Sequence, residues 1–172
     1  MIMADVFKIL FIILGTLITT VAYWLLFEAL FRRVVERASV VYETSPYKTA
    51  ILGAVVGVPL FVASLGLLNS AAGLKLFGAI LMSGLLLVGL LGSAGLARLV
   101  GARLASATDA AYPWRRVLRG GVVLSITFVL PVVGWFFVLP LTLASGVGAV
   151  ILSRWGRRAA QLVPPSVPVV NA

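Results

Sequence analysis

The chain has 172 residues, of which 62% are hydrophobic and only 11% are charged. Soluble domains carry about 25% charged residues, so a water-exposed fold would leave too much apolar surface in contact with water. The absence of cysteine and histidine excludes thiol chemistry, Cys/His zinc sites and imidazole acid–base catalysis. We therefore expect an all-α integral membrane protein.

Apolar runs long enough to cross a bilayer follow one another along the chain. A transmembrane helix needs about 20 predominantly apolar residues, and the first three predicted spans are residues 7–31, 49–68 and 76–97. The first run is too long for the apolar region of a signal peptide, so we expect it to be retained.

The charge-free stretch 120–153 is too long for one helix. It is interrupted between Pro131 and Gly134, and proline and glycine are typical of a turn. We expect a helical hairpin with arms 116–130 and 134–153. Because the first arm is short, two architectures stay open: a bundle of about five spans, or four elements with a re-entrant C-terminal hairpin.

The basic residues sort to one side of this arrangement. All but Lys8 and Lys75 fall in the loop after the first span, the loop after the third span and the C-terminal tail. The positive-inside rule then predicts an N-terminus outside and a C-terminus in the cytoplasm. Aromatic residues such as Trp24 and Tyr42 are expected at headgroup depth beside these clusters. The residues predicted to contact anionic headgroups and set topology are Arg32, Arg33, Arg37, Lys48, Arg98, Arg103, Arg115, Arg116, Arg119, Arg154, Arg157 and Arg158.

Glu28 is the one carboxylate placed inside a predicted span. Intramembrane carboxylates are functional candidates, but Arg32 follows one helical turn later. An interfacial ion pair between these two residues is the favoured interpretation.

Small residues spaced four apart allow two helices to approach closely. Intrachain packing is favoured over packing between chains. The predicted packing residues are Gly53, Gly57, Gly89, Ser93, Ala144 and Gly148.

The two cytoplasmic connections resemble each other. Each has a basic helical end, then a proline followed by an aromatic and a basic residue, at Pro46 and at Pro113. A glycine follows seven residues after each proline, at Gly53 and Gly120. This pattern favours a duplicated two-helix unit with the last helix added, and internal repeats are common in transporters.

Several segments of the second half carry a further likeness. They are Arg98–Arg103, Pro113–Trp114, Gly120–Gly121, Pro131–Trp135 and Gly146–Ala149. Together they resemble the membrane domain of polymer-forming cytoskeletal proteins of the bactofilin type, over about residues 32–153. The chain departs from that family in lacking a glycine-rich, Val/Ile-alternating β-helix segment. The resemblance implies at most a membrane anchor or a partner of such a scaffold.

These features predict a transmembrane domain over 1–158 and a proline-rich, extended or disordered cytoplasmic tail over 159–172. We expect a non-enzymatic assembly subunit or anchor of a bacterial-type inner membrane, without cofactor or metal, that packs with other membrane proteins or with itself and does not bind nucleic acid. The alternative is a small oligomeric channel or transporter, which the possible repeat and the helix prolines Pro59 and Pro140 would suit.

Overall fold

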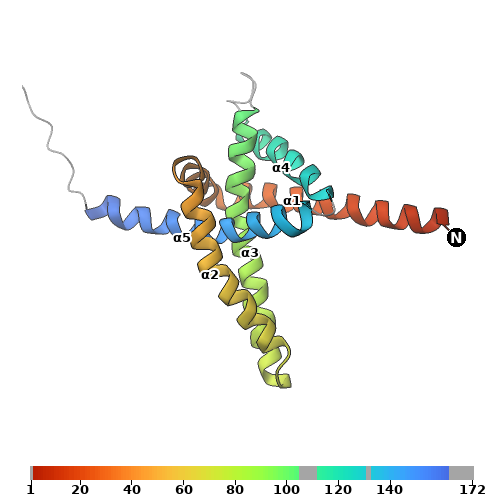
Figure 1. Ribbon diagram of the computed structural model, residues 1–172. Helices are drawn as coiled ribbons and strands as arrows, with labels where there is room; N and C mark the ends of the chain where they lie inside the picture. Colours follow the sequence, from red (N-terminus) through yellow and green to blue (C-terminus); the bar gives the residue numbers. More distant parts are fainter. Residues whose placement is uncertain (1, 105–111, 131–132, 163–172) are drawn as a thin grey trace, which may run out of the picture.

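The structure is a computed structural model, and it describes residues 2–104, 112–130 and 133–162. Every regular element in that part of the chain is helical, which confirms the all-α class. The elements in chain order are α1 (Ile2–Thr44), α2 (Pro46–Leu68), α3 (Ala72–Arg103), α4 (Pro113–Val129), the π-helical turn η2 (Gly134–Val138) and α5 (Leu139–Leu162) (Figure 1).

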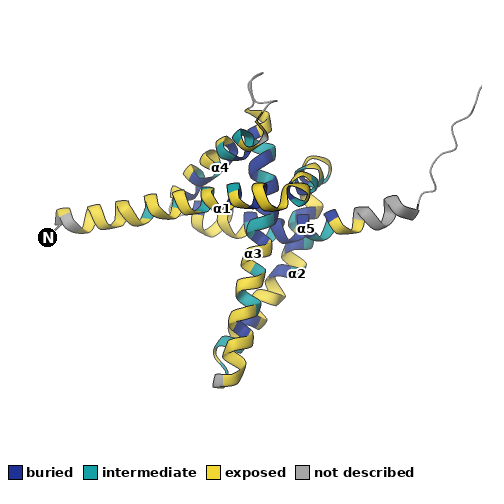
Figure 2. Ribbon diagram, turned by 180° about the vertical axis from the view of Figure 1, so that it is seen from behind, coloured by how far each residue is buried: buried dark blue, intermediate teal, exposed yellow. Residues whose placement is uncertain are grey.

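Four helical segments are long and apolar enough to cross a membrane. They are Asp5–Thr44, Pro46–Leu68, Gly73–Arg103 and Gly134–Trp155. Most residues of these segments are exposed on the outside of the protein (Figure 2). Many of the exposed residues are large and apolar. Apolar exposure on this scale is tolerable only in hydrocarbon. The chain is therefore a multi-pass membrane protein.

Helix α4 bears on the two architectures that the sequence left open. It has 17 residues and is not among the four candidate spans. At 1.5 Å per residue it extends about 25 Å, which is less than the hydrocarbon thickness of about 30 Å. The hairpin 120–153 thus pairs one helix that is long enough to cross with one that is too short, which favours the re-entrant hairpin over five full spans.

The helices do not run as a parallel bundle. In both views α1 and α5 lie across the hairpin formed by α2 and α3, while α4 packs beside α3 at the end away from the α2–α3 turn (Figures 1 and 2). The main apolar core lies where these helices cross. Its buried members are Trp24, Phe27, Val35, Ala94, Ala97, Val117 and Phe128.

Helices α2 and α4 begin at Pro46 and Pro113, the prolines of the two similar connections. Ser45 occupies the N-cap position of α2 but makes no side-chain capping bond. The glycines seven residues later both meet another backbone closely, but Gly53 meets α5 and Gly120 meets α3. The likeness between the connections therefore does not extend to how the two helices pack.

Helix α5 continues to Leu162, four residues into the segment predicted to be an extended tail. This corrects the predicted start of the tail, because a helix persists beyond residue 158. Residues 163–172 lie outside the described residues, as does Asp109 in the loop before α4.

Candidate functional site

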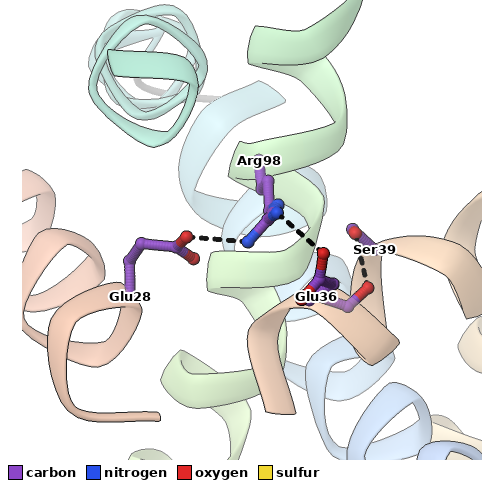
Figure 3. Close-up of polar contacts among 4 residues, drawn as sticks. All are labelled: Glu28, Glu36, Ser39 and Arg98. Carbon is purple, nitrogen blue, oxygen red and sulfur yellow. Dashed lines mark hydrogen bonds and ion pairs between the residues drawn. The ribbon is translucent and has the colours of Figure 1, made fainter. Parts of the chain in front are cut away.

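A buried ion pair lies where α1 crosses α3. Nη1 of Arg98 donates to Oε1 of Glu28 over 2.7 Å, and the two residues are 8% and 4% exposed (Figure 3). A charge-assisted contact of this length is among the stronger polar interactions in proteins. Within a membrane-spanning segment, neither charge could be accommodated without such a partner.

Arg98 also spans a break in α1. The backbone of Phe31 leaves helical geometry, with φ −123° and ψ 36°, and so divides α1 into two helical segments. Glu28 precedes this break and Glu36 follows it, and Nη2 of Arg98 donates to Oε1 of Glu36 over 3.3 Å (Figure 3). One guanidinium therefore holds both segments of the kinked helix.

The second contact is weaker than the first, because the Glu36 side chain is 56% exposed whereas that of Glu28 is 5% exposed. The hydroxyl of Ser39 donates to the carbonyl oxygen of Glu36 over 2.6 Å, one turn further along α1 (Figure 3). Three buried atoms of the described residues lack a hydrogen-bond partner: Oε2 of Glu28, Nε of Arg116 and Oγ of Ser125.

This geometry corrects two predictions. Arg98 was assigned to headgroup contact, but it is buried between helices, because Glu28 draws the guanidinium inward. Glu28 was expected to pair with Arg32, yet its ion pair is with α3, and Arg32 is exposed. Because the backbone at Phe31 is not helical, Arg32 does not lie one regular helical turn beyond Glu28 on the same face.

A sequence signal for the inward position of Glu28 did exist. The buried residues of each segment of α1 share one face, at i, i+3 and i+4 before the break and at i, i+3 and i+7 after it. They are Trp24, Phe27 and Glu28 in the first segment and Val35, Ala38 and Tyr42 in the second. Extending the apolar pattern through Glu28 would have placed its side chain against another helix.

Two aromatic residues expected at headgroup depth instead join helices. The indole N–H of Trp24 donates to Oγ of Ser93 on α3 over 2.9 Å, and Trp24 is 1% exposed. The hydroxyl of Tyr42 donates to Oγ of Ser145 on α5 over 3.0 Å. Their polar atoms are satisfied inside the protein, so neither side chain needs the interface.

The other predicted headgroup residues lie at or near the surface. Arg32, Arg33, Lys48, Arg103, Arg119 and Arg154 are exposed, and Arg37, Arg115 and Arg116 are half-buried. Arg115 lies over the rings of Tyr112 and Trp114, 4.6 and 5.7 Å from their centroids. The side chains of Arg157 and Arg158 lie outside the described residues.

Five of the six predicted packing residues meet another helix of the same chain. A side chain at Gly53 would overlap the backbone of Ala144, and one at Gly148 would overlap α2. Gly89 approaches Leu143 and Gly146 of α5, and Ser93 accepts the Trp24 bond. Gly57 is buried, but the space beside it is open.

One close crossing was not predicted. Gly92 of α3 lies against Gly146 of α5, and a Cβ on Gly92 would overlap the Gly146 backbone. Gly101 and Gly120 similarly join α3 to α4. Helix α5 is thus held between α2 and α3 by small residues, a mode of association that suits helices in lipid.

The arrangement offers little reactive chemistry. Among the described residues no group of three acidic side chains is placed to hold a metal ion. The buried charges bind one another and so fix helix positions. The chain matches no known protein family, no curated protein and no solved structure.

Proposed function

We propose that this protein is a non-catalytic membrane subunit that packs with another membrane protein through the first half of α1. The observation that carries the proposal is the isolation of that helix from the rest of the fold. Only 6% of the most apolar stretch of α1 is buried, which is the lowest share among the four spans; the shares are 17% for α2, 11% for α3 and 44% for the span that ends in α5. A span with so few partners in its own chain has its faces available to another protein.

The exposed face of this helix suits close packing. Gly15 has no atom within 4 Å of the position a Cβ would take, and Thr19 is exposed one turn later. Small residues at this spacing let a second helix approach along its backbone. The resemblance to bactofilin-type membrane domains adds one partner class, a polymer-forming scaffold at the membrane.

A channel or transporter has less support. Such a protein needs polar groups along a path through the membrane. Here Glu28 and Arg98 bind each other, and the cavity between α1, α3 and α5 is lined almost entirely by apolar side chains.

Substituting Gly15 tests the proposed interface. Gly15→Leu is expected to remove the partner from the complex isolated in lipid nanodiscs, because leucine would keep the second backbone away. Gly84→Leu, an equally open glycine on α3, is the matched control and should retain the full mass. Native mass measurement of both samples gives the result. A complex that survives Gly15→Leu unchanged, or a wild-type particle that is strictly monomeric, contradicts the proposal.

We also propose that the basic side faces the cytoplasm of a bacterial-type inner membrane, where it meets anionic headgroups. The cysteine-free sequence makes this testable by single-cysteine labelling. Asn69→Cys at the α2–α3 turn should react with an impermeant maleimide in intact cells. Thr44→Cys, exposed at the end of α1, should react only after permeabilisation. The reverse pattern would invert the orientation.

A further inference from the structure

A long cavity runs beside the first half of α1. Its volume is about 450 Å³, and its other walls come from α3, the end of α4, η2 and the start of α5. Along α1 the lining residues extend from Ile9 to Trp24. At 1.5 Å per residue this is a length of about 22 Å.

The cavity is narrow for its length. Its volume of about 450 Å³ is spread over that whole length. An α-helix with side chains is about 10–12 Å across, so a helical segment of the same length occupies roughly 1,700–2,500 Å³. A partner helix therefore does not fit between these walls, whereas a single extended hydrocarbon chain does.

The polar groups of the lining are already satisfied. The hydroxyls of Thr16, Thr20 and Thr142 each donate to a preceding carbonyl oxygen of their own helix over 2.8 Å. The Trp24 indole donates to Ser93. The hydroxyls of the wall and the Trp24 indole are thus hydrogen-bonded within the protein, and water in such an apolar space would find too few partners.

We propose that this cavity binds one acyl chain of a membrane lipid, lying along α1 between Ile9 and Trp24. Apart from the end of α4, the walls belong to helices long and apolar enough to cross a membrane, so the surrounding solvent is lipid. The bound chain would fill the space between α1 and α5 and support the otherwise isolated half of α1. Gly15 is not among the residues that line this cavity, so the proposal does not rest on the proposed partner.

Fluorescence quenching can detect the chain. Changing Trp114, Trp135 and Trp155 to phenylalanine leaves Trp24 as the single tryptophan. Trp24 is 1% exposed and lines the inner end of the cavity. In nanodiscs of phospholipid brominated at mid-chain, we expect Trp24 to lose most of its fluorescence relative to unbrominated lipid.

Filling the cavity supplies the specific control. Thr20→Phe, in the wall one turn before Trp24, should restore the fluorescence because the ring occupies the space of the chain. Ile18→Phe, at an exposed position of α1 outside this lining, is the control and should leave the quenching unchanged. Thr16→Phe is a second filling variant at an exposed position of the wall, and circular dichroism checks that each variant remains helical.

Three results would overturn the proposal. Trp24 fluorescence that is the same in brominated and unbrominated lipid shows that no acyl chain reaches the cavity. Quenching that disappears as the protein-to-lipid ratio rises, together with dimers of the chain, assigns the cavity to a second copy of the protein. Equal protection of Trp24 by Ile18→Phe and Thr20→Phe would place the lipid contact elsewhere.

Discussion

Arg98→Met is expected to lower the free energy of unfolding by about 3–5 kcal/mol, because it leaves the Glu28 carboxylate buried without its partner. Methionine retains most of the length of the side chain, so the loss comes from the charge and its hydrogen bonds. Unfolding in mixed micelles with increasing SDS, followed by circular dichroism, measures the effect. Arg103→Met, an exposed arginine five residues later on α3, should change stability by only about 0.5 kcal/mol.

The double variant Glu28→Gln with Arg98→Met separates this cause from a packing defect. Removing both charges should recover much of the lost stability, since a neutral buried pair avoids the uncompensated charge. Glu36→Gln should cost less than about 1 kcal/mol, because the Glu36 side chain is half-exposed. If the double variant is no more stable than Arg98→Met, the buried carboxylate is not the source of the loss.

Gly92→Val is expected to destabilise the fold by about 1–3 kcal/mol or more, because its side chain would overlap the backbone of Gly146. Helices α3 and α5 would have to separate, and their van der Waals contacts would weaken along the whole crossing. In lipid those contacts are a main source of helix association. The same SDS titration provides the measurement.

Gly84→Val is the matched control for this crossing. It lies on α3 two turns before Gly92, and no atom stands within 4 Å of its Cβ position. Both variants replace glycine by valine in the same helix, so the change in helix propensity is the same. The difference between their free energies of unfolding therefore measures the effect of the α3–α5 crossing. Equal stability of Gly92→Val and Gly84→Val would show that the α3–α5 contact contributes little.

The membrane spans could be predicted from the sequence because each is a local property. Length and apolar composition within one segment decide whether it can cross a bilayer. The short α4 was visible for the same reason, since Pro131 ends the apolar run after Arg119 too early for a full span. Whether that helix crosses was still open, and its observed length favours a re-entrant hairpin over five full spans.

Contacts between distant segments could not be predicted in the same way. Arg98 and Arg103 look alike in the sequence, as basic residues at the end of one apolar run. They differ because Arg98 faces Glu28, which lies 70 residues earlier in the chain. The glycines of α3 cannot be told apart from the sequence either, yet Gly92 lies in a helix crossing and Gly84 does not.

The sequence by itself determined that this protein is helical, that it crosses the membrane several times and where its basic residues gather, because composition and position along the chain decide these properties. Only the tertiary structure decided that Arg98 joins the two segments of α1, that α5 lies between α2 and α3, and that a narrow cavity follows α1. Those features depend on which faces of separate helices meet. In lipid that choice follows from close packing and buried polar pairs, which hydrophobicity alone does not distinguish.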